Sequence, residues 1–282
     1  MTEGDGDATP PILRGKFHGS ASEFTPESLL REARRQKDLE ESPVPEVCVL
    51  DPDGDIVRHL QATGRARRDP AWACYHSELY RFEQGGREYG IVGCAVGASY
   101  AVLVAEQMFA SGCRLLISIT SSGQITALRP PPYFILIERA LRDEGTSYHY
   151  LPPSEYSEAD AVLVELVSAG LSGIGEPVER GATWTTDAPF RETAEAIGAA
   201  RAKGILAVEM EAAALYAYAH ARRKPVLCFA HVTNQMGLAE GDFEKGEANG
   251  AKAALALVHA AADAWLQSCS VGQRRDERSP QP

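Results

Sequence analysis

The segment Ala207-Val208-Glu209-Met210-Glu211-Ala212-Ala213-Ala214-Leu215-Tyr216 places two carboxylates among apolar residues. Its first residues are typical of a strand and its last residues of a helix, so the pattern predicts a strand-to-helix junction at the glutamates. A buried carboxylate costs free energy unless it is paired or accepts hydrogen bonds. The junction is therefore the first candidate for a functional site.

The positions of Glu209 and Glu211 allow two interpretations. Residues two apart on a regular helix point about 200° from each other, so both side chains face one ligand only if the helix begins between them. In that case a vicinal diol supplies the two hydroxyl donors that a buried carboxylate accepts. Alternatively, both glutamates are first-turn residues that the helix dipole favours.

Short apolar runs occur on both sides of this junction in the sequence. They are bounded by Gly, Pro or charged residues, which is typical of strands buried on both faces. The runs cover residues 47–50, 89–93, 115–119, 133–137 and 226–230, and helical patterns cover 25–39, 99–111, 159–169, 189–203, 210–221 and 247–267. This alternation predicts an α/β fold, a single-domain three-layer α/β/α sandwich with a central mixed, largely parallel sheet.

The ends of the chain differ from its middle in composition. We expect residues 1–12 and 271–282 to be disordered tails, because they are polar and lack apolar periodicity. Residues 13–45 are predicted to be an N-terminal helical extension, since Thr25 and Pro26 are typical of a helix start. Residues 46–270 form the main domain, because no linker long enough to divide them is present.

The charge balance of the 282-residue chain excludes some classes of partner. There are 28 Lys and Arg residues against 39 Asp and Glu residues, which gives a net charge of −11. A basic surface for nucleic acid or an anionic membrane is therefore not expected. No apolar run approaches the roughly 18 residues of a membrane-spanning helix. Six cysteines without C-x-x-C spacing favour reduced thiols, and we expect a cytoplasmic protein.

Several chemistry-bearing motifs are missing from the sequence. It contains no complete dinucleotide fingerprint, no phosphate-binding G-x-x-x-x-G-K-[ST] loop and no G-x-S-x-G or H-E-x-x-H motif. The seven histidines never pair at metal-ligand spacing. We expect no metal site and no organic cofactor.

The segment 208–213 resembles the ribose-binding signature of the nucleoside phosphorylase superfamily. This superfamily includes uridine phosphorylases, hexameric purine nucleoside phosphorylases and nucleosidases. Other segments are similar to its motifs in the same order along the chain. They are Gly54-Asp55-Ile56-Val57-Arg58, Gly97-Ala98-Ser99, Arg142-Asp143-Glu144-Gly145-Thr146-Ser147, Thr186-Asp187-Ala188-Pro189-Phe190 and Val232-Thr233-Asn234.

The resemblance implies a nucleoside phosphorylase-like glycosyltransferase, a pentosyltransferase of nucleotide salvage similar to uridine phosphorylases. Such an enzyme cleaves the N-glycosidic bond of a nucleoside with inorganic phosphate and releases the base and a pentose 1-phosphate. Glu211 and Asn234 are the expected catalytic residues, on the ribose hydroxyls and the departing base respectively. Glu209, Met210 and Phe190 are expected to bind the nucleoside, with Phe190 stacked on the base.

The resemblance also implies an anion site at the carboxyl ends of the strands. Gly54, Arg58 and Ser121 are expected to bind phosphate, with Gly123 beside Ser121 in the substrate site. Phosphate is then a co-substrate rather than a cofactor, and the family implies a homo-oligomer, a dimer or a ring of dimers. From the residues alone, an ordinary turn with a surface arginine is the favoured interpretation of Gly54 and Arg58, and a core position that of Phe190.

One departure from the family pattern concerns phosphate. Where the family has an arginine before the cradle, this chain has Ser118 in Ser118-Ile119-Thr120-Ser121. Two alternatives to phosphorolysis therefore stay open. The first is a nucleosidase, in which water replaces phosphate, and the second is a catalytically silent nucleoside-binding protein. The choice between a purine and a pyrimidine base is also open.

Overall fold

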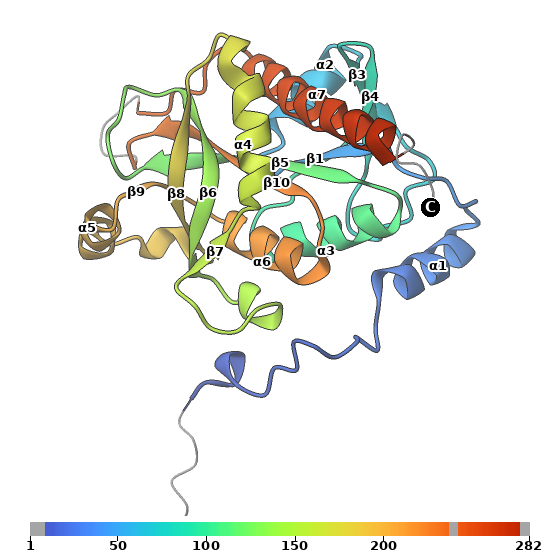
Figure 1. The fold of residues 1–282 in the computed structure, drawn as a ribbon, viewed down its shortest axis with the longest axis horizontal. Coiled ribbons are helices and arrows are strands. Elements are labelled where there is room, and N and C mark those ends of the chain that lie inside the picture. The colour runs from blue at the N-terminus through green and yellow to red at the C-terminus, as the bar shows by residue number, and fades with distance from the viewer. Residues whose placement is uncertain (1–8, 237–241, 277–282) are drawn as a thin grey trace, which may run out of the picture.

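A mixed sheet lies between two layers of helices (Figure 1). The computed structural model describes residues 9–236 and 242–276. Within them the strand order is β10-β6-β8-β9-β5-β1-β4-β3-β2, with β7 paired to β6. This mixed α/β architecture confirms the fold class predicted from the sequence.

Strands and helices alternate along most of the chain. The strands are β1 Val47–Asp51, β2 Arg67–Arg68, β3 Tyr80–Gln84, β4 Arg87–Gly93, β5 Leu115–Gln124, β6 Tyr133–Asp143, β7 Tyr156–Glu158, β8 Val178–Thr186, β9 Ile205–Glu209 and β10 Val226–Asn234. The α-helices are α1 Pro26–Lys37, α2 Asp55–Ala62, α3 Ala98–Ala110, α4 Ala161–Gly170, α5 Ala194–Ala202, α6 Ala212–Arg222 and α7 Ala251–Asp276. Short 3-10 turns are η1 Pro11–Leu13, η2 Ser147–His149, η3 Leu171–Gly173 and η4 Pro189–Arg191.

Part of the sheet closes on itself. Strand β10 pairs in parallel with β5 and antiparallel with β6. Because β6, β8, β9 and β5 are also paired in that order, these strands and β10 form a closed ring. The remaining strands extend from β5 through β1 and β4, which pair in parallel.

The two faces of the sheet carry different helices. Helices α3 and α6 pack on one face, where the buried residues include many alanines that allow close approach. Helices α2, α4 and α7 pack on the other face, around leucine, isoleucine and phenylalanine side chains. In Figure 1 the helices α4 and α7 lie above the sheet, and α3 and α6 lie below it.

The predicted N-terminal helix is present as α1. Thr25 accepts a hydrogen bond from the Ser28 N–H at 3.2 Å, and Pro26 occupies the first helical position. The helix ends at Lys37, because Asp38 adopts a left-handed conformation with φ of 53°.

The helix predicted over 189–203 and the predicted C-terminal tail differ most from the structure. The helix predicted over 189–203 is divided into η4 and α5, because Thr193 caps α5 by accepting from the Ala196 N–H. The predicted C-terminal tail starts inside α7, which continues to Asp276. Residues beyond 270 are polar but include good helix formers, so the helix continues without an apolar stripe. Of the predicted N-terminal tail, residues 1–8 lie outside the described residues.

Tyr216 connects α6 to the closed ring of strands. Its hydroxyl group donates to the Ile137 carbonyl oxygen of β6 at 2.6 Å and accepts from the Cys228 N–H of β10 at 3.0 Å. The side chain is fully buried. Both backbone groups would lose a partner without the hydroxyl, since water does not reach them.

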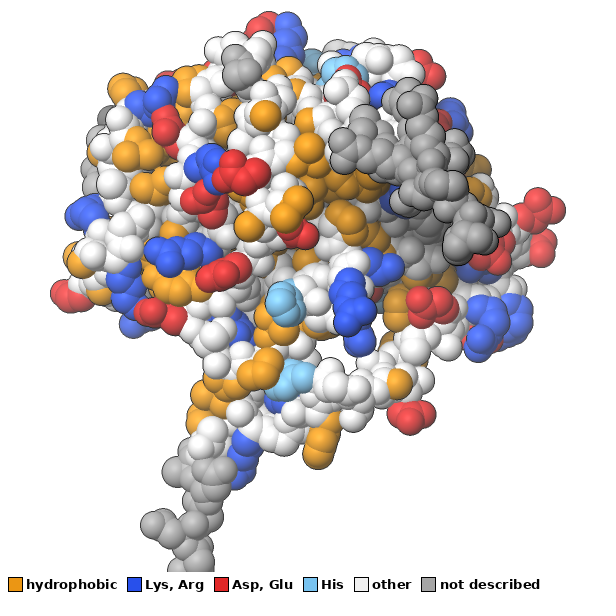
Figure 2. Space-filling view, viewed as in Figure 1, with side chains coloured by type: hydrophobic (Ala, Val, Ile, Leu, Met, Phe, Trp, Pro, Cys, Tyr) orange, Lys and Arg blue, Asp and Glu red, His pale blue; other side chains and the backbone are white. Residues whose placement is uncertain are grey.

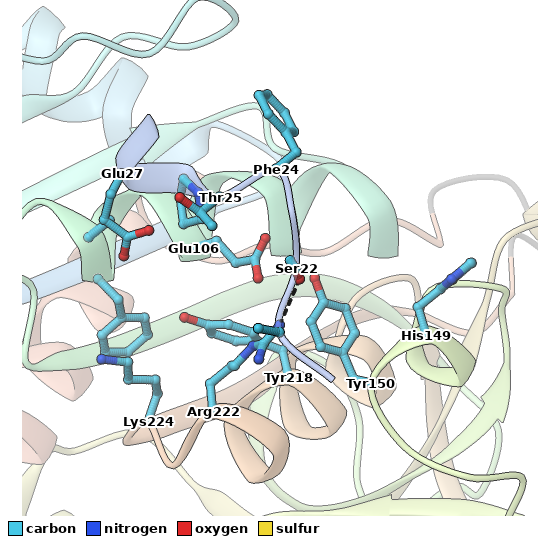
Figure 3. Close-up of a pocket in the computed structure, with 14 residues that line it drawn as sticks. Ser22, Phe24, Thr25, Glu27, Glu106, His149, Tyr150, Tyr218, Arg222 and Lys224 are labelled. Carbon is cyan, nitrogen blue, oxygen red and sulfur yellow. Dashed lines mark hydrogen bonds between the residues drawn. The ribbon is translucent and has the colours of Figure 1, made fainter. Parts of the chain in front are cut away.

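Replacing Tyr216 by Phe should therefore lower the free energy of unfolding by about 1–3 kcal/mol. Chemical denaturation monitored by circular dichroism measures this change. Tyr218→Phe is the matched control, because the Tyr218 side chain lies on the same helix but faces a cavity (Figure 3). Equal stability of the two variants would contradict the role given to the Tyr216 hydroxyl.

Candidate functional site

The candidate site lies where β1, β5 and β10 end and where α6 begins. The Ser121 backbone N–H of β5 donates to Asp53 Oδ2, in the turn after β1, at 2.6 Å. The Ser121 hydroxyl lies 2.9 Å from the Thr233 hydroxyl of β10. Ligands of open α/β sheets bind at the carboxyl ends of the strands, so this position agrees with the general rule.

Glu209 caps the N-terminus of α6. Its Oε2 accepts from the backbone N–H groups of Glu211 and Ala212, each at 2.7 Å. Its Oε1 accepts from the hydroxyl groups of Thr183 at 3.1 Å and Thr185 at 2.5 Å. Burial raises the pKa of Glu209 above its ordinary value, and these four donors act against that rise. The carboxylate is thus occupied within the protein. Glu209 ends β9 and Glu211 is the N-cap of α6, so neither lies in the first helical turn, and binding of the nucleoside by Glu209 stays a prediction.

Glu211 has one oxygen without a partner. Its Oε1 accepts from the Gly97 N–H at 2.7 Å, in the turn that precedes α3. Its Oε2 is buried and has no hydrogen-bond partner among the described residues. The side chain is 1% exposed. An unsatisfied buried acceptor is rare in folded proteins, so this oxygen is the best candidate for a contact with a ligand donor.

The environment of Glu211 favours its protonated form in the free protein. Burial, followed by the nearby charge of Glu209, raises the pKa of Glu211 to about 8. The Gly97 hydrogen bond and the nearby Thr120 hydroxyl group act in the opposite direction. A ligand that donates to both oxygens would favour the ionised carboxylate.

Three aspartates occupy the turn after β1. Asp51 accepts from the Gly54 N–H at 3.1 Å and from the Val57 N–H at 2.9 Å, and burial raises its pKa to about 7. Burial also raises the pKa of Asp53. Asp55 forms ion pairs with Arg58 at 2.9 Å and with Lys245 at 2.6 Å. The turn therefore places negative charge where the sequence predicts a phosphate ligand.

The predicted phosphate ligands Gly54 and Arg58 do lie side by side, but protein acceptors already use their donors. The Gly54 N–H donates to the Asp51 carbonyl oxygen at 2.9 Å as well as to its carboxylate. Arg58 lies on α2 and donates to the Asp53 carbonyl oxygen at 2.5 Å and to Asp55. Phosphate binding by Gly54 and Arg58 therefore stays a prediction, and in this structure the Gly54 N–H is used at the start of α2.

Gly123 and Asn234 meet where β5 and β10 end. A Cβ atom at Gly123 would lie 2.4 Å from the Met236 sulfur, so a larger residue would displace this flexible side chain. The Asn234 amide donates to the Ser122 carbonyl oxygen at 3.4 Å, and its oxygen accepts from the Met236 N–H at 2.9 Å. These bonds are typical of a residue that starts a turn directly after a strand.

Phe190 and Met210 differ in how they relate to this site. Phe190 lies in η4 and is 99% exposed, so its ring packs against nothing in the described chain. The predicted helix start at this position is absent, because the turn ends before Thr193. Met210 is half-buried between Glu209 and Glu211, beside the predicted sugar ligand.

Three contributors to the site were not predicted from the sequence. They are the Asp53 carboxylate, the Gly97 N–H and the two hydroxyl groups of Thr183 and Thr185. The sequence Asp51-Pro52-Asp53-Gly54-Asp55, at the end of a strand, could have indicated Asp53 as a site residue. Gly97 has φ of 90°, a conformation that L side chains rarely adopt, so glycine is needed for its N–H to reach Glu211.

A large cavity lies away from this site. It measures about 610 Å³ and lies between residues 21–27, before and at the start of α1, and the C-terminal ends of α3 and α6 (Figure 3). Glu106, Tyr150, Tyr218 and Arg222 line it, and Arg222 donates to the Ser22 hydroxyl at 3.4 Å. None of the predicted site residues is among its lining residues, so we do not assign the nucleoside to it.

Charge and composition of the described residues add three observations. Acidic and basic side chains are interspersed over the face seen in Figure 2. No helix in residues 9–236 and 242–276 is both long and apolar enough to cross a membrane. In the same residues, no group of three or more His, Cys, Asp and Glu side chains is arranged to hold a metal ion.

Comparisons with known proteins identify a family and solved structures with a similar fold. A family model described as "Phosphorylase superfamily" matches residues 48–263. A uridine phosphorylase from Vibrio fischeri ES114, in complex with 6-hydroxy-1-naphthoic acid, superposes with a TM-score of 0.65 at 19% identity. The alignment covers 82% of this chain and 94% of that one. A second structure of uridine phosphorylase from the same organism gives a TM-score of 0.65 at 21% identity, over 80% and 94% of the two chains. No curated protein matches the sequence.

The substitutions Glu209→Gln and Glu211→Gln should affect different properties, stability in the first case and nucleoside binding in the second. Gln at 209 presents an amide N–H₂ to donors, so it should lower the free energy of unfolding by roughly 1–3 kcal/mol. Gln at 211 is neutral without a bound proton, so it should not lower the free energy of unfolding near neutral pH, but it should weaken nucleoside binding roughly tenfold or more. Denaturation curves and isothermal calorimetry measure the two effects. A stable Glu209→Gln variant, or unchanged binding by Glu211→Gln, would oppose these assignments.

The stability of the free protein should fall as pH rises from about 5 to 8. The ordinary pKa of the Glu211 carboxyl is 4.5 and its folded pKa is about 8, so in this window the native state holds a proton that the unfolded state has lost. The slope from one such group is about 1.4 kcal/mol per pH unit. Urea unfolding at several pH values should show a shallower slope for Glu211→Gln than for the wild type. Identical slopes would contradict the raised pKa.

Proposed function

Because the chain belongs to the phosphorylase superfamily, we propose that it cleaves the N-glycosidic bond of a nucleoside, with water as the nucleophile. One observation carries the choice of water. The Asp53 carboxylate accepts from the N–H of Ser121, a residue predicted to bind phosphate, at 2.6 Å. An anionic nucleophile would have to displace this carboxylate and approach Asp51 and Asp55 as well. Ser118 supplies no positive charge in compensation.

Glu211 is the proposed ligand of the sugar. Its unpartnered Oε2 and its Oε1 can accept from the 2′ and 3′ hydroxyl groups of ribose. The ionised carboxylate then stabilises the positive charge that develops on the ribosyl ring as the bond to the base breaks. Glu209 acts indirectly, because it fixes the start of α6 and hence the direction of the Glu211 side chain.

Asp53 is the proposed base for the attacking water. Its raised pKa makes it a better proton acceptor than an exposed aspartate, and the Ser121 N–H holds one of its oxygens in place. The water oxygen forms a bond to C1′ while the bond from C1′ to the base nitrogen breaks. One water proton passes to Asp53 and subsequently to the nitrogen of the departing base. Asn234, whose amide bonds to Ser122 and Met236 in the free protein, would have to exchange one of these bonds to contact the base.

Phosphorolysis is the second candidate, and a specific contact favours it. The Arg58 guanidinium lies against Gly54, with Nη1 2.8 Å from the position of a Cβ atom built on this glycine. A phosphate that displaced Asp53 from Ser121 would find this cation beside it. The two candidates differ in their sugar product, which is free ribose for water and ribose 1-phosphate for phosphate.

Product analysis with a panel of nucleosides tests this proposal. We expect base and free sugar, with or without inorganic phosphate, and roughly 100-fold or greater loss of kcat in Asp53→Asn. Asp55→Asn is the control, since Asp55 pairs with Arg58 and Lys245 instead of Ser121. A sugar 1-phosphate product would favour phosphorolysis. Binding of nucleosides without base release from any substrate would instead leave a nucleoside-binding protein.

A further inference from the structure

The cavity at the C-terminal ends of α3 and α6 is partly built by a segment outside the family match (Figure 3). Its volume of about 610 Å³ lies within the range of roughly 300–1,000 Å³ that is usual for small-molecule sites. Its outer wall consists of residues 21–27, which precede the segment 48–263 that the family model matches. The cavity therefore includes a wall that the matched part of the chain does not supply.

Glu106 is a carboxylate in an unfavourable place. It lies on α3 near the end of this helix at Ala110, where the helix dipole disfavours negative charge. Burial raises the pKa of Glu106, and the nearby charge of Glu27 acts in the same direction. The Tyr150 hydroxyl group and the Arg222 charge act against this rise, but no cation of the described residues forms an ion pair with Glu106. A cationic ligand group beside this carboxylate would favour its ionised form.

An aromatic surface lies along the same cavity. The Tyr218 ring centroid is 6.0 Å from that of Phe109 and 5.7 Å from that of Tyr150. Tyr218 is 2% exposed, and in the described part of the chain no residue forms a hydrogen bond with its hydroxyl group. A buried tyrosine hydroxyl group usually has a partner, and the faces of aromatic rings attract ammonium groups. Both features suit a polar ligand with an apolar part.

Two cations line the cavity on the side of α6. In Figure 3 Glu106 comes from α3, and Arg222 and Lys224 lie at and after the end of α6. Arg222 donates to the Ser22 hydroxyl group through Nη2 at 3.4 Å, so its other N–H groups are available to a ligand. Lys224 Nζ lies 5.3 Å from the centroid of the Phe109 ring. The cavity thus offers an acceptor for a cation and donors for an anion.

We propose that this cavity binds a zwitterionic α-amino acid with an aromatic side chain. Glu106 accepts from the ammonium group of the ligand, and Arg222 and Lys224 donate to its carboxylate group. The ligand side chain packs against Phe109 and Tyr218. Two cations disfavour a simple amine and Glu106 disfavours a simple carboxylate, whereas a zwitterion pairs with both kinds of charge. The site is separate from the candidate nucleoside site and does not depend on the proposed reaction.

Isothermal calorimetry with L-phenylalanine, phenethylamine and 3-phenylpropionate tests the proposal, because the three probes share a phenyl ring and differ in charge. We expect the wild type to bind L-phenylalanine at least about tenfold more tightly than either analogue, since each analogue lacks one charge-assisted contact. Glu106→Gln and Arg222→Gln should each weaken binding of L-phenylalanine about tenfold. Arg223→Gln is the matched control and should leave it unchanged, because Arg223 is adjacent to Arg222 but does not line the cavity.

Equal affinity of the wild type for L-phenylalanine and either analogue would overturn the proposal, since one of the two charges would then contribute nothing. Binding of L-phenylalanine that neither Glu106→Gln nor Arg222→Gln weakens would also overturn it, because the ligand would then lie elsewhere. So would the absence of binding at millimolar concentration. The comparison of the three probes on the wild type decides the question even if a variant fails to fold. Cleavage of nucleosides is measured separately, so failure of the proposed function leaves this result unaffected.

Discussion

The hydrogen bonds from Glu211 and Ala212 to the Glu209 carboxylate determine how the candidate site is built. They start α6 immediately after β9 and place Glu211 at the helix cap instead of on a helix face. Glu211 then reaches across to the Gly97 N–H at the start of α3. Since α3 and α6 pack on the same face of the sheet, one capped turn aligns two helices and leaves one acceptor oxygen for a ligand.

The site is unusual in its charge, because carboxylates dominate it. Glu209 and Glu211 lie on one side, and Asp51, Asp53 and Asp55 follow β1 on the other. Such an arrangement suits a reaction in which positive charge develops on a sugar and a neutral nucleophile attacks.

The sequence predicts the junction at Glu209 and Glu211, the mixed α/β fold and the cap at Thr25, because each is encoded within a few neighbouring residues. Strand β8 escapes prediction since it is rich in threonine, and its buried hydroxyl groups are explained only by their bonds to Glu209. The contact between Asp53 and Ser121 joins residues 68 positions apart and has no local signature. Likewise, the exposure of Phe190 depends on where the next helix begins.

The closed ring of strands has a consequence for how the protein is made. Strand β10, the last strand in the sequence, lies between β5 and β6. Until the ribosome has released it, the edges of β5 and β6 stay unpaired, with apolar residues on both sides that can pair with other chains. The turn at Asn234 and the Thr233 contact to Ser121 also arrive with this strand. During synthesis the ring of strands and the candidate site are thus completed together, after which only α7 among the described helices remains to pack on the sheet.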